Sequence, residues 1–288
     1  MALLHAHEDD EYRAEFSTLV VRGGPWSGEL PTELAHLNLD LLDEHAFAGW
    51  PKGDLGGAGN GWVQATTADR NHVTLQAHDA PPPLPRDLDE WEDVMETPFL
   101  NAGRGVLLTQ VLSDRSAGRM ESGPPGLYRV RICRRRLADR SRWALRFWPV
   151  QGVPEPPRRL ARSRSAAQRA DQDSGALAMG LVAVALWSPG DASRADLAER
   201  LLVSPQEVDA ALRYAEQYEL LHATGADTVT LTPVDRRPPE ERDPHALHRQ
   251  RGIELRAWAD RQGIRINEPG RIPPEVIARY GQGNSSLE

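Results

Sequence analysis

Apolar residues cluster in short runs over residues 1–150, and glycine- and proline-rich segments separate the runs. Short apolar runs bounded by turn residues are typical of β-strands. Apolar and basic side chains alternate over Leu127–Arg135, which predicts a half-buried antiparallel strand with an arginine-rich outer face. The predicted strands are Phe16–Arg22, Trp62–Thr67, His72–Ala77, Gly105–Leu112, Leu127–Cys133 and Trp143–Val150. We therefore expect a β-rich, sandwich or barrel-like domain over residues 1–150.

Two stretches of this domain depart from the strand pattern. Pro31–Trp50 resembles a helix for part of its length, and Asp87–Glu96 predicts a short helix or an acidic loop. The acidic residues of the second stretch form a charge run without the context of a catalytic pair. The domain carries no motif that indicates a chemistry, which leaves self-association, ligand sensing and partner binding as open roles.

Residues 151–174 are predicted to be a linker, because prolines open the segment and arginines follow them. Low hydrophobicity and high charge do not support a packed core. The five arginines of this segment are Arg158, Arg159, Arg162, Arg164 and Arg169. We expect these guanidinium groups to add contacts to phosphates if the protein binds nucleic acid.

Residues 175–235 predict three helices followed by a strand. Ala176–Trp187 is apolar throughout, and Ser193 is placed to cap a second helix that ends near Leu201. Ser204, Pro205 and Glu207 provide the N-cap, first-turn proline and capping-box acid of a third helix. With a strand over Asp227–Thr232, this order resembles a winged helix-turn-helix.

A second linker, residues 236–244, precedes a predicted helix-loop-helix over residues 245–283. The first helix spans His245–Gln262, and Gly263 is placed to end it. The second helix spans Pro273–Tyr280 after a loop that contains Pro269 and Gly270. Together, the segments predict an α+β multidomain protein with a β-rich N-terminal domain, a central winged helix-turn-helix and a C-terminal helix-loop-helix.

Charge is distributed unevenly along the chain, whose net charge is -8. Residues 175–235 contain 3 basic and 9 acidic residues, a net charge of -6, whereas residues 236–288 contain 10 and 8, a net charge of +2. Nucleic acid would be repelled by the first block and tolerated by the second. No apolar run approaches the length of a membrane span, and the acidic start does not resemble a signal peptide, so we expect a cytoplasmic protein.

The stretch from Gly252 to Tyr280 resembles the C-terminal DNA-binding domain of the actinobacterial Lsr-type, H-NS-like nucleoid-associated proteins. The resemblance rests on the predicted helix that contains Trp258 and on Gly263, which is placed to end it. It also rests on the run Gly270-Arg271-Ile272-Pro273 and on Val276 and Tyr280. It covers about 30–40 residues and implies that an arginine–glycine–arginine triplet enters the narrow minor groove of AT-rich DNA.

Gly270 and Arg271 match this triplet, whereas Pro269 stands at the position of the first arginine and Glu268 precedes it. The loss of one groove arginine predicts weaker DNA binding than the family resemblance implies. Neighbouring arginines are candidates for phosphate contacts, although a solvated helix face explains them equally well. These residues are Arg249, Arg251, Arg256, Arg261 and Arg265.

Other candidates carry less specific signals. The third helix of the winged unit offers Gln206, Arg213 and Gln217 to DNA or to a protein partner. The acidic N-terminal stretch that begins His5-x-His7 has metal-binding side chains, but we expect it to be a mobile chain end and predict no metal site. The chain carries no nucleophile elbow, phosphate-binding glycine loop or cysteine cluster, so neither an enzyme nor a cofactor is expected.

The resulting hypothesis is a non-enzymatic transcriptional regulator or nucleoid-associated protein that binds AT-rich double-stranded DNA. The alternative is a protein-interaction adaptor, because the C-terminal helices also resemble the peripheral-subunit-binding domains of 2-oxoacid dehydrogenase complexes. Self-association through the β-rich domain or the winged unit is compatible with both hypotheses.

Overall fold

The computed structural model describes residues 1–26, 30–42, 56–110, 116–163, 174–188, 190–225 and 228–235. Contacts divide the chain into two compact units, Met1–Val234 and Asp235–Glu288. The helix-loop-helix predicted over residues 245–283 lies outside the described residues. The described part contains both helices and strands, is rich in sheet and forms three sheets. No helix within these ranges has the length and apolarity needed to cross a membrane.

The largest sheet has six strands, and only its β10–β5 pair is parallel. In spatial order its strands are β1 (Leu3–Arg13), β5 (Arg70–His78), β10 (Ser141–Pro149), β9 (Gly126–Arg136), β6 (Asp93–Asn101) and β11 (Arg158–Ala161). A second, antiparallel sheet contains β3 (Gly57–Ala58), β4 (Trp62–Thr66), β2 (Thr18–Arg22), β7 (Gly105–Thr109) and β8 (Ser116–Glu121). A 3-10 helix, η1 (Thr32–Leu34), follows β2.

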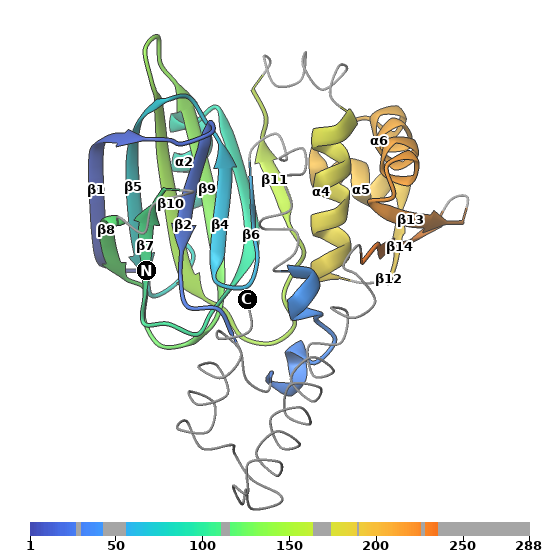
Figure 1. The fold of residues 1–288 in the computed structure, drawn as a ribbon, viewed down its shortest axis with the longest axis horizontal. Helices are drawn as coiled ribbons and strands as arrows, with labels where there is room; N and C mark the ends of the chain where they lie inside the picture. The colour runs from blue at the N-terminus through green and yellow to red at the C-terminus, as the bar shows by residue number, and fades with distance from the viewer. Residues whose placement is uncertain are drawn as a thin grey trace, which may run out of the picture. The chain divides into compact units, whose positions relative to one another are not determined.

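The strands of the two large sheets are labelled in Figure 1, and side chains of both sheets share one apolar core. Side chains from both sheets are fully buried there, because residues two apart on a strand project to the same face. Among the largest are Tyr12, Leu19, Leu75, Phe99, Leu108, Trp143 and Phe147. The side chains of β1 are mostly exposed apart from Tyr12, which explains why the apolar pattern did not predict this strand.

Each of the six predicted strand segments contains a strand, but the predicted outer face of β9 is wrong in one respect. An arginine-rich outer face suggested solvated side chains, whereas Arg129 and Arg131 of that face are buried and Arg135 is exposed. The helix α2 (Leu84–Glu90) lies against part of this face, where its Asp87 binds Arg131. The sequence pattern identified the strand correctly but not the element that packs on it.

The region predicted to be a linker contributes β11, which pairs with β6. The sequence analysis expected no strand there, because the segment is polar and arginine-rich. The strand is compatible with this composition because Arg158 forms an ion pair with Glu96, at 2.9 Å between Nη2 and Oε2. A charge that looked solvated in the sequence therefore helps to hold β11 on the sheet.

Three helices and a small sheet follow. They are α4 (Ser174–Trp187), β12 (Gly190–Ser193), α5 (Arg194–Leu201), α6 (Pro205–Gln217), β13 (Leu221–Thr224) and β14 (Thr228–Pro233). The three strands pair in the order β12-β14-β13, all antiparallel. The predicted caps are present: the Ser193 side chain accepts a hydrogen bond from the Asp196 amide, and Ser204 and Glu207 form a capping box.

The helical segment packs on the β-rich segment within the first compact unit. Apolar residues of both, among them Leu100, Leu127 and Leu181, share a second core. The indole of Trp187 in α4 donates a hydrogen bond to the carbonyl of Ala58, at 3.2 Å. The β-rich and helical segments are therefore joined by packing as well as by the chain.

Candidate interaction surface on α6

The capping box and one apolar stripe determine how α6 is oriented. Val208, Ala211, Leu212 and Ala215 are buried, at the three- and four-residue spacing that places side chains on one helix face. The opposite face is therefore directed to solvent.

The capping-box residue Glu207 has a lowered pKa. Burial alone would raise the pKa of Glu207, but hydrogen bonds from Ser204 and the ion pair with Arg162 outweigh the effect of burial and leave that pKa below its usual value.

Gln206, Arg213 and Gln217 are all exposed on α6. Their spacing of seven and four residues places them along one side of the helix. The structure thus brings together the three side chains that the sequence analysis offered to a partner.

Two tyrosines extend this surface, and the sequence analysis did not include them. The rings of Tyr214 and Tyr218 lie 4.3 Å apart between centroids, and Tyr218 is 48% exposed. Their four-residue spacing on a predicted helix was the available signal. An amphipathic aromatic side chain of this kind is common in protein interfaces.

The charge of the α6 surface is predominantly negative. Glu216 and Glu219 are exposed near Arg213 in the sequence. Asp209 lies on the same helix and forms an ion pair with Arg194, at 2.8 Å between Oδ1 and Nε. Since phosphate neutralisation supplies most of the non-specific affinity for DNA, this helix is poorly suited to approach a phosphate backbone.

Several basic side chains of the β-rich segment are bound to carboxylates. Glu96 accepts hydrogen bonds from Arg129, Arg131 and Arg158, and its side chain is only 3% exposed. Burial alone would raise the pKa of Glu96, but the hydrogen bond and charge of Arg131, with those of the other two arginines, hold it below its usual value. All three guanidinium groups are bound to Glu96, those of Arg129 and Arg131 in buried positions and that of Arg158 at the surface.

A second carboxylate, that of Asp87 on α2, joins Glu96 of β6 in this buried network. Asp87 binds Arg146 and also binds Arg131, the latter at 2.5 Å between Oδ2 and Nη1. Separately, Arg134 binds Asp93 at 2.7 Å. Asp87 and Asp93 belong to the run that appeared in the sequence as surface charge, whereas both are buried counter-ions. The network fastens α2 and β11 to the sheet.

The arginines of β11 and the segment after it are also engaged. Arg162 binds Glu207 of α6 at 3.2 Å between Nη1 and Oε1, and it donates to the carbonyl of Leu202 at the same distance. Arg158 is bound to Glu96. These two arginines therefore connect parts of the protein, in contrast to the phosphate contacts expected of them from the sequence. Arg164 and Arg169 lie outside the described residues.

The DNA-binding candidates of the C-terminal segment are likewise outside the described residues. They are Arg249, Arg251, Arg256, Arg261, Arg265, Gly270 and Arg271. Their assignment continues to rest on the sequence.

Comparison with protein-family models finds no match, and comparison with curated proteins finds none either. Two solved structures are similar over 52% of this chain and 100% of their own. One is ComJ, described as an inhibitor of the DNA-degrading activity of NucA from Bacillus subtilis, at 10% identity and a TM-score of 0.33. The other is described as crocagin biosynthetic gene J, at 13% identity and a TM-score of 0.35. Similarities this weak assign no function to the chain.

Proposed function

We propose that the protein is a non-enzymatic DNA-binding regulator or nucleoid-associated protein whose DNA contact is made by residues 245–283. The observation that supports the proposal is the run Gly270-Arg271-Ile272-Pro273, which follows the Trp258 helix in the sequence. A narrow AT-rich minor groove has an enhanced negative potential that attracts an inserted arginine. Glycine beside that arginine permits close approach of the backbone to the duplex.

Four arginines of the described residues are bound to carboxylates within the fold, and α6 is acidic. Arg129, Arg131 and Arg158 are paired with Glu96, and Arg162 is paired with Glu207. The α6 surface carries exposed carboxylates. These four arginines are therefore bound within the fold, whereas others on the β-rich segment, among them Arg13, Arg70 and Arg104, are exposed.

In this proposal the helical unit from α4 to β14 is a winged helix used for protein contact. Its order of elements and its β12-β14-β13 sheet are compatible with that fold, in which α6 occupies the position of the recognition helix. The acidic surface and exposed Tyr218 favour a protein over a nucleic acid there. The acidic α6 surface and exposed Tyr218 also support the second candidate function, an adaptor that binds proteins without binding DNA.

Fluorescence anisotropy of the full chain on AT-rich and GC-rich duplexes, over a series of salt concentrations, tests the proposal. We expect tighter binding to the AT-rich duplex, weakening as salt rises. Arg271→Ala should lower the affinity by about tenfold. Arg213→Ala is the matched control, because it removes an exposed arginine from α6, and it should leave the affinity unchanged. Equal and negligible binding of both duplexes at low salt would reject DNA binding in favour of the adaptor.

The adaptor can be examined with a second copy of the chain as the partner. Sedimentation velocity over a range of concentrations would detect self-association through α6. Tyr218→Asp adds a charge to the centre of that surface and should dissociate such an assembly. Self-association that is unchanged in Tyr218→Asp would place the interface elsewhere.

A further inference from the structure

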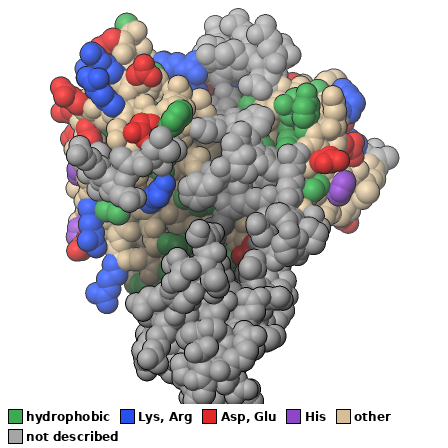
Figure 2. All heavy atoms as spheres, viewed as in Figure 1, with side chains coloured by type: hydrophobic (Ala, Val, Ile, Leu, Met, Phe, Trp, Pro, Cys, Tyr) green, Lys and Arg blue, Asp and Glu red, His purple; other side chains and the backbone are tan. Residues whose placement is uncertain are grey.

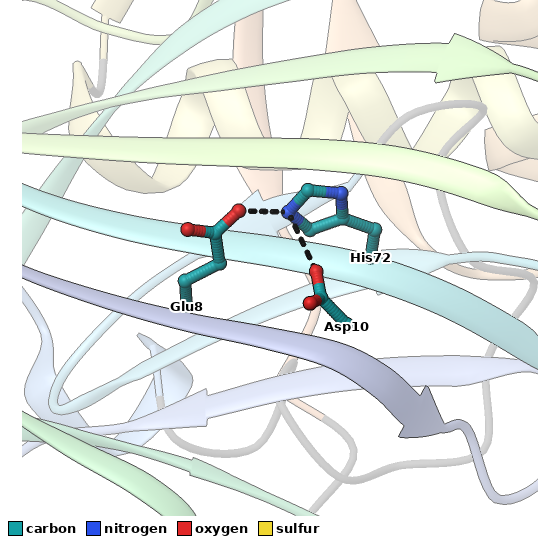
Figure 3. A group of neighbouring side chains, drawn as sticks. All are labelled: Glu8, Asp10 and His72. Atoms are coloured by element: carbon teal, nitrogen blue, oxygen red, sulfur yellow. Dashed lines mark hydrogen bonds and ion pairs between the residues drawn. The ribbon is translucent and has the colours of Figure 1, made fainter.

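Three potential metal ligands converge on the outer face of the six-stranded sheet, at its β1 edge. Glu8 and Asp10 lie two residues apart on β1, so they project to the same face. His72 lies on β5, which pairs with β1 so that Glu8 is opposite Thr74. Figure 3 shows the imidazole of His72 directed at both carboxylates. Its Nε2 is 2.6 Å from Oε1 of Glu8 and 3.4 Å from Oδ1 of Asp10.

The spacing of these atoms is close to that of a coordination shell. One ligand atom from each side chain lies within 4.8 Å of the other two. In a tetrahedral zinc site with bonds near 2.1 Å, neighbouring ligand atoms are about 3.4 Å apart. The separation of His72 from Asp10 already has this value. Glu8 needs to withdraw by less than about 1 Å to meet the same geometry, and its 61% exposed side chain can rotate to do so.

An ordinary ion pair explains only part of the arrangement. A protonated Nε2 carries one hydrogen, which a single carboxylate accepts, whereas two carboxylates converge on this nitrogen. Their mutual repulsion would be offset by a cation held between them. The imidazole is well positioned as a ligand, because its side chain is only 20% exposed.

The neighbouring basic group on the sheet is directed elsewhere. Arg142 of β10 stands in register with His72. Its guanidinium binds Glu90, at 3.1 Å between Nη1 and Oε1, and lies over the ring of Trp91. This arginine therefore does not occupy the position between Glu8 and Asp10.

The histidines that precede Glu8 in the sequence do not join this cluster. His5 and His7 project to the other side of β1, where His5 lies 3.7 Å from Glu121 and His7 packs against Gly118. The N-terminal segment is also not the mobile end that the sequence suggested, because it forms an 11-residue strand. The fold thus separates the His5-x-His7 pair from the acidic residues and supplies a different histidine.

We propose that Glu8, Asp10 and His72 form a binding site for a divalent transition-metal ion. One imidazole nitrogen with two carboxylate oxygens suits Zn²⁺ better than Mg²⁺ or Ca²⁺, which prefer oxygen ligands. Three protein ligands leave coordination positions for water or for a ligand from a partner. The bound ion would link the edge strand β1 to β5. The proposal is independent of DNA binding, since it uses other residues and another part of the chain.

Isothermal titration of the full chain with ZnCl₂ tests the site. We expect a saturable 1:1 component, which His72→Gln, Asp10→Asn and Glu8→Gln should each weaken by about tenfold or more. His5→Gln is the matched control, because it removes an exposed β1 histidine from the opposite face, and it should leave this component unchanged. Binding unaffected by His72→Gln, or lost equally in His5→Gln, would overturn the assignment and indicate adventitious zinc binding only.

Thermal unfolding provides a readout that separates binding from misfolding. Each variant should unfold at the wild-type midpoint in the presence of a chelator, because the three side chains are at the sheet surface. Zinc should raise the midpoint of the wild-type protein, since a ligand that binds only the folded state stabilises it, and should not raise that of His72→Gln. An equal rise in both proteins would contradict the proposed site.

Discussion

The β6–β9 region of the six-stranded sheet and the exposed face of α6 both carry many charges, but in opposite environments. On the sheet, Glu96 and Arg131 are each about 3% exposed and are bound to each other. On α6, Arg213 and Glu216 are exposed. A buried charge must be paired to be tolerated, so the first set is committed to the fold. The second set remains available to a partner, which is why the candidate interaction surface is placed there.

The largest effect should come from breaking the buried network. Glu96→Gln removes the carboxylate shared by three arginines and leaves buried guanidinium charge without compensation. We expect a loss of about 3–5 kcal/mol in the free energy of unfolding, measured by urea denaturation. Glu216→Gln on α6 is the matched control and should change that free energy by less than about 0.5 kcal/mol. Similar losses for both variants would remove the distinction between the two surfaces.

Acid should weaken the buried network by protonating Glu96. The pKa of Glu96 is lowered in the folded protein from an ordinary value of 4.5. Its contribution to stability is therefore complete above about pH 4.5 and is lost as the pH falls through the folded-state pKa. Urea denaturation between pH 6 and pH 3 should show a steeper loss for the wild-type protein than for Glu96→Gln. Parallel curves would show that Glu96 does not titrate as the network requires.

A smaller effect is expected from Tyr218→Ala on α6. Since Tyr218 is 48% exposed, its truncation should lower the free energy of unfolding by about 1 kcal/mol or less. Buried Tyr128 offers the contrast, because truncation of a fully buried aromatic side chain should cost about 3–5 kcal/mol. Chemical denaturation of both variants checks the comparison. A large loss in Tyr218→Ala would mean that this ring supports the fold and is not available to a partner.

The smallest effect concerns the turn between α5 and α6. Leu202 has a left-handed backbone, with φ 52° and ψ 51°, which is unfavourable for a residue with a Cβ atom. Leu202→Gly should relieve that strain while increasing the entropy of the unfolded chain, for a net gain of at most about 1 kcal/mol. The turn does not belong to either charged surface, so the variant should leave the pH dependence of stability unchanged. A marked loss of stability would show that the Leu202 side chain contributes more packing than its exposure suggests.

Local sequence signals predicted the helical unit better than the sheets. The Ser204–Glu207 capping box and the Ser193 cap depend on hydrogen bonds between residues three apart, and both are present. The exposed stripe of Gln206, Arg213 and Gln217 also followed from helix periodicity. In contrast, β1 and β11 were not predicted. Their side chains are mostly polar, and these two segments form strands by pairing with β5 and β6, which no local pattern indicates.

By itself the sequence determined where the amphipathic strands and capped helices begin, because those choices depend on neighbours along the chain. It also supplied the resemblance around Gly270 and Arg271 that carries the proposed DNA contact. Only the tertiary structure decided that Arg129 and Arg131 of β9 are buried, since Glu96 of β6 and Asp87 of α2 bind them. It alone brought His72 to Glu8 across 64 residues, because strand pairing joins positions that no local pattern connects.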